Sequence, residues 1–141
     1  DSCNYYSGGQ SEHLLGRLIR NAGIARESIV VATKFGMPMS DHANARGYSR
    51  KNIFAAVDAS LQRLEMEYID LYQTHIWDQG TNLEEMMSAL ADLVSAGKVL
   101  YIGATDMPAW QFVKANCIAG SHNAPRFVSM QNHYNLVWRE E

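Results

Sequence analysis

Apolar residues recur with helical spacing in the first part of the chain. Within the range 11–22, leucine or isoleucine stands at four positions that share one side of a helix, which predicts a helix there. Gly23 follows, where a helix often ends in the left-handed conformation. The β-branched, apolar range 29–33 then predicts a buried strand. The polar range 35–48 contains proline and glycine and reads as a long loop, and such a loop in a compact domain usually has a function.

Three further helices follow, each with a recognisable residue at its start. Ser49 is a good N-cap for one helix, and Asn82, with Glu85 three residues later, resembles a capping box that begins another. Gly97 ends that second helix, and Pro108 suits the first turn of the last one. The apolar residues at helical spacing are Ile53, Val57, Leu61 and Leu64, then Leu83, Met87, Leu90 and Val94, then Trp110, Val113 and Cys117.

Four short apolar runs are separated from one another by whole helices. Their starts lie roughly thirty to forty residues apart, which is typical of alternating strand–helix units. Strands separated in this way cannot pair as hairpins, so we expect a parallel sheet with right-handed crossovers and an α/β fold. The predicted strands are 29–33, 68–74, 99–103 and 127–131.

The composition predicts one folded domain spanning residues 1–141. Of the 141 residues, 47% are hydrophobic and only 19% are charged, which is enough for one core and too apolar for disorder. The net charge of −3, without a basic run, argues against a nucleic-acid partner. No apolar run could span a bilayer, no signal-peptide pattern opens the chain, and Cys3 and Cys117 make no disulfide framework. We therefore expect a cytoplasmic protein without a membrane segment.

Polar side chains stand at the end of every predicted strand. They are Lys34, His75, Thr105 with Asp106, and Gln131. Sites in parallel α/β folds gather at these strand ends, so the pattern favours a functional site. Lys34 directly follows buried residues, where an unpaired ammonium is costly, although its stem could pack while the ammonium reaches solvent. Taken alone, His75 is more often a structural histidine than a catalytic one.

Other familiar motifs are missing from the sequence. It contains neither G-x-x-x-x-G-K-[ST] nor G-x-S-x-G, and Ser7-Gly8-Gly9 lacks the strand and the third glycine of a dinucleotide fingerprint. The remaining histidines lie on predicted helix faces or in loops without metal-ligand spacing, so we expect no metal site.

A series of motifs resembles the aldo-keto reductases, in the order that the family has them. DSCNYYSGG at the start resembles the family's D-x-x-x-x-Y stretch, and VVATKFG, RGYSRKNIF, LQRLEMEYIDLYQTHIWD, SAGKVLYIGAT and VSMQNHYNL follow. The resemblance covers essentially the whole chain. Within the family it is strongest to bacterial and fungal oxidoreductases related to potassium-channel β-subunits. It implies a (β/α)8 TIM barrel, here a partial one, with its site at the C-terminal ends of the strands.

The resemblance also implies a catalytic set and a reaction. Carried over, the family's Asp, Tyr, Lys and His are Asp1, Tyr6, Lys34 and His75. The implied chemistry is reversible hydride transfer between NADPH and a small aldehyde or ketone, with Tyr6 as proton donor. Lys34 would stabilise the phenolate of Tyr6, and Asp1 would pair with Lys34. His75 would orient the carbonyl oxygen, and Trp77 would line the substrate pocket.

The cofactor-binding residues follow the family less closely. Gln131 matches the family's glutamine for the nicotinamide carboxamide, and Thr105 keeps a hydroxyl where the family has serine. Asp106 replaces an asparagine, and an ionised carboxylate accepts hydrogen bonds but donates none.

The length predicts an incomplete barrel, because a closed one takes about 250 residues. We expect these residues to belong to a longer enzyme, and on their own to have little or no reductase activity and to tend toward self-association. Two alternatives stay open, a non-catalytic NADP-binding regulatory subunit and an inactive truncated product. The presence of Tyr6, Lys34 and His75 together favours the enzyme.

Overall fold

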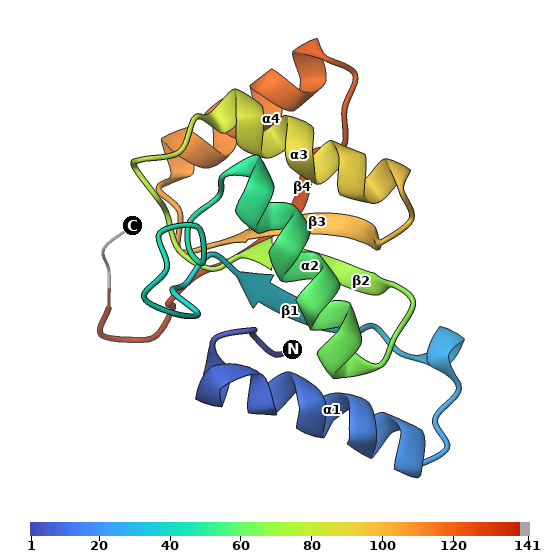
Figure 1. The fold of residues 1–141 in the computed structure, drawn as a ribbon. Coiled ribbons are helices and arrows are strands. Elements are labelled where there is room, and N and C mark those ends of the chain that lie inside the picture. Colours follow the sequence, from blue (N-terminus) through green and yellow to red (C-terminus); the bar gives the residue numbers. More distant parts are fainter. Residues whose placement is uncertain (139–141) are drawn as a thin grey trace.

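The computed structural model describes residues 1–138 and contains one parallel sheet whose strands alternate with helices (Figure 1). The four strands lie side by side in the order in which they occur in the chain, so the predicted parallel α/β fold is confirmed. The strands are β1 (Ala32–Phe35), β2 (Ile69–Thr74), β3 (Val99–Thr105) and β4 (Phe127–Gln131). The helices are α1 (Gln10–Asn21), α2 (Arg50–Leu64), α3 (Leu83–Ser95) and α4 (Ala109–Ser121), with short 3-10 turns η1 (Tyr6–Gly9) and η2 (Arg26–Ser28).

Helices α2, α3 and α4 cover one face of the sheet, and α1 packs beside α2 (Figure 1). The core lies between this layer and the sheet, where Tyr72 and Ile102 of the strands pack with Ile53 of α2 and Leu90 of α3. On the opposite face Tyr101 is 58% exposed, although its neighbour Ile102 is fully buried. This one-sided packing of consecutive strand–helix units is that of part of a (β/α)8 barrel.

The N-terminal segment, residues 1–5, extends the sheet beyond β1. The backbone N–H of Ser2 donates to the carbonyl of Ala32 at 2.9 Å, and that of Asn4 donates to the carbonyl of Lys34 at 3.0 Å. These alternate bonds hold the segment along the edge of β1 that β2 leaves free. Side chains of the first residues are thereby fixed next to the end of β1.

The predicted helix starts are largely confirmed. Ser49 caps α2, since its side chain accepts from Asn52 N–H, and Asn82 caps α3 by accepting from Glu84 N–H. The predicted capping box is wrong, because the Glu85 carboxylate accepts from the backbone N–H of Arg50 on α2. None of the helices within residues 1–138 has the length and apolar character needed to cross a membrane.

Helix α4 begins one position later than predicted. Pro108 is its N-cap with an extended ψ of 136°, and not the first helical residue. The carbonyl of Pro108 accepts the first hydrogen bonds of the helix, from the backbone N–H groups of Gln111 and Phe112, while its extended ψ keeps Pro108 outside the helix. The predicted side with Trp110 and Cys117 faces away from the sheet, where both are exposed.

Strand β1 begins at Ala32, later than the predicted start at Ile29. Side chains form hydrogen bonds with backbone groups of the residues before Ala32. Val31 N–H donates to the Asp70 carboxylate at 2.8 Å, and Arg26 donates to the Ile29 carbonyl at 3.2 Å. The Val31 carbonyl still accepts from the backbone N–H groups of Asp70 and Leu71, so the strand ladder before Ala32 is partial, which the apolar composition of the range could not reveal.

A buried carboxylate ties α1 to β1 and α2. Glu12 is fully buried, accepting from Thr33 Oγ1 at 2.5 Å and from Arg63 Nε at 2.7 Å. Nearby, α1 and α2 approach so closely that a Cβ on Gly16 would lie 2.1 Å from the carbonyl oxygen of Leu64. The position of α1 therefore depends on a polar network and on one residue without a side chain.

Candidate active site

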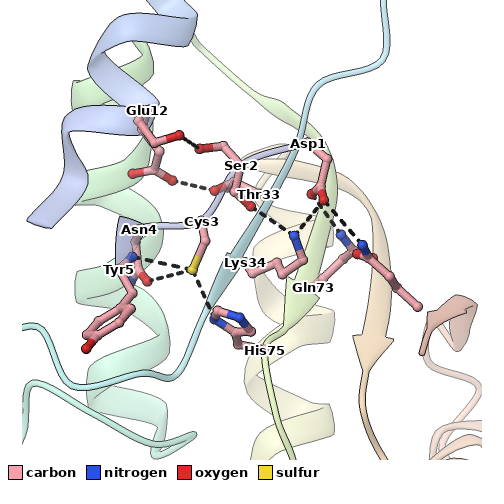
Figure 2. A network of polar contacts seen from close by, with 12 residues as sticks. Asp1, Ser2, Cys3, Asn4, Tyr5, Glu12, Thr33, Lys34, Gln73 and His75 are labelled. Atoms are coloured by element: carbon pink, nitrogen blue, oxygen red, sulfur yellow. Dashed lines mark hydrogen bonds and ion pairs between the residues drawn. The ribbon is translucent and has the colours of Figure 1, made fainter. Parts of the chain in front are cut away.

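Lys34 is buried on β1, and its ammonium is paired instead of reaching solvent. Its exposed fraction is 2%, and its Nζ donates to Asp1 Oδ2 at 2.6 Å and to the carbonyl of Ser2 at 3.2 Å. Asp1 reaches Lys34 because the N-terminal segment runs along β1 (Figure 2). A buried ammonium requires partners of this kind. The alternative in which the ammonium reaches solvent is therefore wrong.

Asp1 collects hydrogen bonds from three different strands. In addition to Lys34 on β1, Gln73 Nε2 of β2 donates to its Oδ1 at 3.4 Å (Figure 2). Gln131 Nε2 of β4 donates to its Oδ2 at 3.5 Å. Sequence reasoning missed Gln73, which the two-residue period of a strand places on the face of His75. Gly103 of β3 leaves the space, because a Cβ there would lie 3.1 Å from Gln73 Cγ.

Tyr6 lies beside both Lys34 and His75. The ring centroids of Tyr6 and His75 are 5.7 Å apart in an edge-on arrangement, and Lys34 Nζ is 5.7 Å from the Tyr6 ring centroid. The side chain is 42% exposed, and its hydroxyl forms no hydrogen bond with any residue in the range 1–138. The hydroxyl is therefore free to bind a ligand.

His75, directly after β2, is held at both its backbone and its ring. Its N–H donates to the hydroxyl of Tyr48 at 3.0 Å, and its Nδ1 lies 3.0 Å from Cys3 Sγ (Figure 2). Burial lowers the pKa of His75, the Lys34 ammonium lowers it further, and Asp106 opposes them. The imidazole is therefore neutral near pH 7 and can donate from one ring nitrogen only.

Tyr48 anchors the long loop against the residues that follow β2. Its hydroxyl accepts from the N–H groups of His75 and Ile76 and donates to the Ile76 carbonyl at 2.6 Å. Burial raises the pKa of Tyr48 to about 12. Gly36, with φ +112°, allows the ring in, since a Cβ there would lie 2.3 Å from a Tyr48 ring carbon. Sequence reasoning predicted the loop but gave no signal for this residue.

The three predicted cofactor-binding residues lie at the ends of β3 and β4. The N–H of Asp106 donates to the carbonyl of Gln131 at 3.0 Å, and β3 continues past its predicted end to Thr105. One Asp106 oxygen accepts from His133 N–H at 2.9 Å. The buried Thr105 hydroxyl has no hydrogen-bond partner within residues 1–138. A buried hydroxyl without a partner suits a ligand that supplies one.

Trp77 lies in a separate hollow next to this cluster. The pocket has a volume of about 500 Å³ and lies between the loop 36–49 and the residues after His75. Trp77, Tyr48, Arg46 and Asp78 are among its lining residues. The role of Trp77 in lining a substrate pocket stays a prediction, and the Trp77 Nε1 atom is buried without a partner among the described residues.

Comparison with known proteins gives one family. The family model described as "Aldo/keto reductase family" matches residues 1–141. The chain is 40% identical to "Aldo-keto reductase dtxS3" of Metarhizium robertsii over 163 aligned residues, which cover 100% of this chain and 44% of the relative. It is 41% identical to "Putative aryl-alcohol dehydrogenase C977.14c" of Schizosaccharomyces pombe and 40% identical to "Versiconal hemiacetal acetate reductase" of Aspergillus parasiticus. The chain is fully covered in both alignments and spans 46% of each of these two relatives, so it has about half the length of the curated relatives it matches.

Proposed function

Because the chain belongs to the aldo/keto reductase family, we propose that it carries the catalytic centre of an NADPH-dependent reductase that converts an aldehyde or ketone to an alcohol. The observation that carries this proposal is the buried Lys34–Asp1 ion pair beside Tyr6 and His75. An ammonium held out of water next to a tyrosine is costly for stability and useful for moving a proton.

The proposed reaction adds one hydride and one proton to the carbonyl group. When bound, the reduced nicotinamide supplies the hydride, which goes to the carbonyl carbon. The Tyr6 hydroxyl gives its proton to the carbonyl oxygen, so the C=O double bond becomes an alcohol and Tyr6 becomes a phenolate. Lys34 stabilises the phenolate, and Asp1 balances the charge of Lys34. Solvent returns the proton, because the Tyr6 side chain is partly exposed.

In this proposal His75 orients the substrate. A neutral imidazole with its proton on Nε2 donates a hydrogen bond to the carbonyl oxygen and makes the carbon more electrophilic. The lowered pKa of His75 supports a donor that is neutral near pH 7 and does not compete with Tyr6 as an acid.

The strand-end residues Thr105, Asp106 and Gln131 would hold the nicotinamide carboxamide. The Thr105 hydroxyl is buried without a partner in the described part of the chain, so it has a proton to donate to the carboxamide oxygen. The Asp106 carboxylate can accept from the carboxamide NH₂ group, although it cannot donate as an asparagine would. These residue types fit the group, and NADPH is proposed over NADH from the family resemblance.

The proposed substrate class is a small aromatic aldehyde or ketone. Aromatic side chains, Trp77 and Tyr48, line the hollow between the loop 36–49 and the residues that follow His75. The names of two relatives refer to an aryl alcohol and to versiconal hemiacetal acetate. Aromatic carbonyl compounds are therefore the first substrates to test.

The test is the consumption of NADPH by the full-length protein with a panel of aromatic and aliphatic aldehydes. Tyr6→Phe should reduce kcat/KM by at least about 100-fold, since it removes the general acid. Tyr5→Phe is the matched control, because Tyr5 is a neighbouring tyrosine that is similarly exposed. Equal activity of Tyr6→Phe and the wild type would reject the mechanism. NADPH binding without turnover by the wild type would support a regulatory subunit instead.

A further inference from the structure

The sulfur of Cys3 is within hydrogen-bond distance of the His75 ring. Its Sγ lies 3.0 Å from His75 Nδ1, and the Cys3 side chain is fully buried (Figure 2). The backbone bonds of Ser2 and Asn4 to β1 fix the segment on either side of it. The thiol is therefore held against one particular nitrogen of the imidazole.

The hydrogen-bonding capacities of the groups around Cys3 decide the direction of this contact. Sγ already accepts from the N–H of Tyr5 at 3.4 Å. The thiol proton has two acceptors within reach, Asn4 Oδ1 at 3.6 Å and His75 Nδ1 at 3.0 Å. The imidazole nitrogen is the nearer of the two, and the unprotonated nitrogen of a neutral imidazole is a good acceptor. Burial raises the pKa of Cys3, so the sulfur keeps its proton and remains a donor.

We propose that Cys3 is a positioning residue that donates its S–H to His75 Nδ1 and thereby fixes the tautomer in which Nε2 carries the ring proton. A neutral histidine has one proton for two nitrogens, and the partner of one nitrogen decides which of them carries it. The reverse tautomer would leave Nε2 without a proton and unable to donate to a carbonyl oxygen. This role deepens the proposed function of His75 and rests on it.

The other groups that face His75 in the described part of the chain do not bind its ring nitrogens, so they do not determine which nitrogen carries the proton. Tyr6 meets the ring edge-on, and Tyr48 binds only its backbone N–H. Lys34 and Asp106 act on the charge of the imidazole, in opposite directions. Among residues 1–138, Cys3 alone forms a hydrogen bond with a ring nitrogen of His75.

The experiment is ¹⁵N NMR of the full-length protein labelled at histidine, which reports the protonation of Nδ1 and Nε2 separately. We expect one tautomer for His75 in the wild type, with the proton on Nε2. Cys3→Ala should lose this single state and give a mixture of tautomers, together with a higher pKa of His75. Cys3→Ser should restore the Nε2–H tautomer, because a hydroxyl can donate to the same nitrogen. Cys117→Ala, which removes an exposed thiol on α4, should leave the His75 signals unchanged.

Enzyme kinetics provide a second measurement. Cys3→Ala should lower kcat about fivefold at nearly constant KM, the factor expected for one net hydrogen bond, and Cys3→Ser should recover it. A His75 proton on Nδ1 in the wild type, or an unchanged tautomer in Cys3→Ala, would overturn the inference. The NMR result does not depend on turnover, so an inactive protein with the expected tautomer would contradict the proposed function and leave the role of Cys3 standing.

Discussion

The hydroxyl of Tyr48 and the backbone of Ile76 are joined by two hydrogen bonds. Tyr48 Oη donates to the Ile76 carbonyl at 2.6 Å and accepts from the Ile76 N–H at 3.1 Å. A third bond, from the N–H of His75, reaches the same oxygen at 3.0 Å. One side chain from the long loop therefore satisfies three backbone groups next to the candidate active site, and this predicts what its removal would do.

Tyr48→Phe should destabilise the protein by about 2–3 kcal/mol, because it leaves the N–H and the carbonyl of Ile76 without a partner. The N–H of His75 keeps its hydrogen bond to the Phe35 carbonyl. The free energy of unfolding is measured by urea denaturation. Tyr101→Phe is the control, since Tyr101 is 58% exposed and its hydroxyl makes no hydrogen bond among the described residues. Equal stability of the two variants would contradict the anchoring role of Tyr48.

Gly36→Ala should destabilise the protein through both backbone strain and a clash. The φ of Gly36 is +112°, and the added Cβ would lie 2.3 Å from a Tyr48 ring carbon. Gly97→Ala separates the two effects, because its φ is +71° and nothing lies within 4 Å of the added Cβ. We expect a loss of about 1–2 kcal/mol at Gly97, from strain alone, and a clearly larger one at Gly36. Equal losses of stability at both positions in thermal unfolding would mean that the Tyr48 ring moves aside to accommodate the methyl group.

Glu12→Gln should reduce stability by about 3 kcal/mol or more. The substitution keeps the shape of the side chain but leaves the partly buried Arg63 without its counter-charge. Glu65→Gln breaks an ion pair to Arg20 in which both side chains are about half exposed, so it should cost no more than about 1 kcal/mol. Urea denaturation of the two variants measures the difference. A loss at Glu12 as small as that at Glu65 would show that the buried pair is not needed.

His75 should make stability depend on pH in the mildly acidic range. Because its pKa in the folded protein lies below the ordinary value of 6.5, the unfolded chain binds more protons there. The stabilising contribution is therefore complete above pH 6.5 and is lost as the pH falls through the lowered pKa. Between about pH 7.5 and pH 5.5 the wild type should lose more stability than His75→Asn, in which position 75 no longer titrates. Equal losses in the two proteins would contradict the shift.

The sequence predicts those features that depend on local patterns. The spacing of the apolar runs along the chain predicts the parallel sheet. The positions at the ends of the predicted strands identify Lys34, His75, Thr105 and Gln131 as candidate site residues. The features that it does not predict depend on contacts between distant segments. Glu12 has the sequence pattern of an ordinary acidic residue on an exposed helix, and only packing against Arg63 makes it a buried partner.

Tyr48 and Cys3 escape prediction for a related reason. A pattern of apolar positions takes account of the ring of Tyr48, but it does not predict the three hydrogen bonds of its hydroxyl. Cys3 gains its contact with His75 only after the N-terminal segment has paired with β1, across 72 positions of the chain. No spacing rule connects residues that far apart.

The Asp1–Gln131 hydrogen bond has a consequence for how the protein folds. It joins residues 130 positions apart, while the Lys34–Asp1 pair spans 33. Closing a loop costs entropy that grows with the logarithm of its length, so contacts between the outermost strands form after the local strand–helix units. The carboxylate of Asp1 therefore has its complete set of donors only when β1, β2 and β4 are all in place. A partly folded intermediate could form the Lys34–Asp1 pair without the hydrogen bonds from Gln73 and Gln131, and catalytic competence should arise as one of the last events of folding.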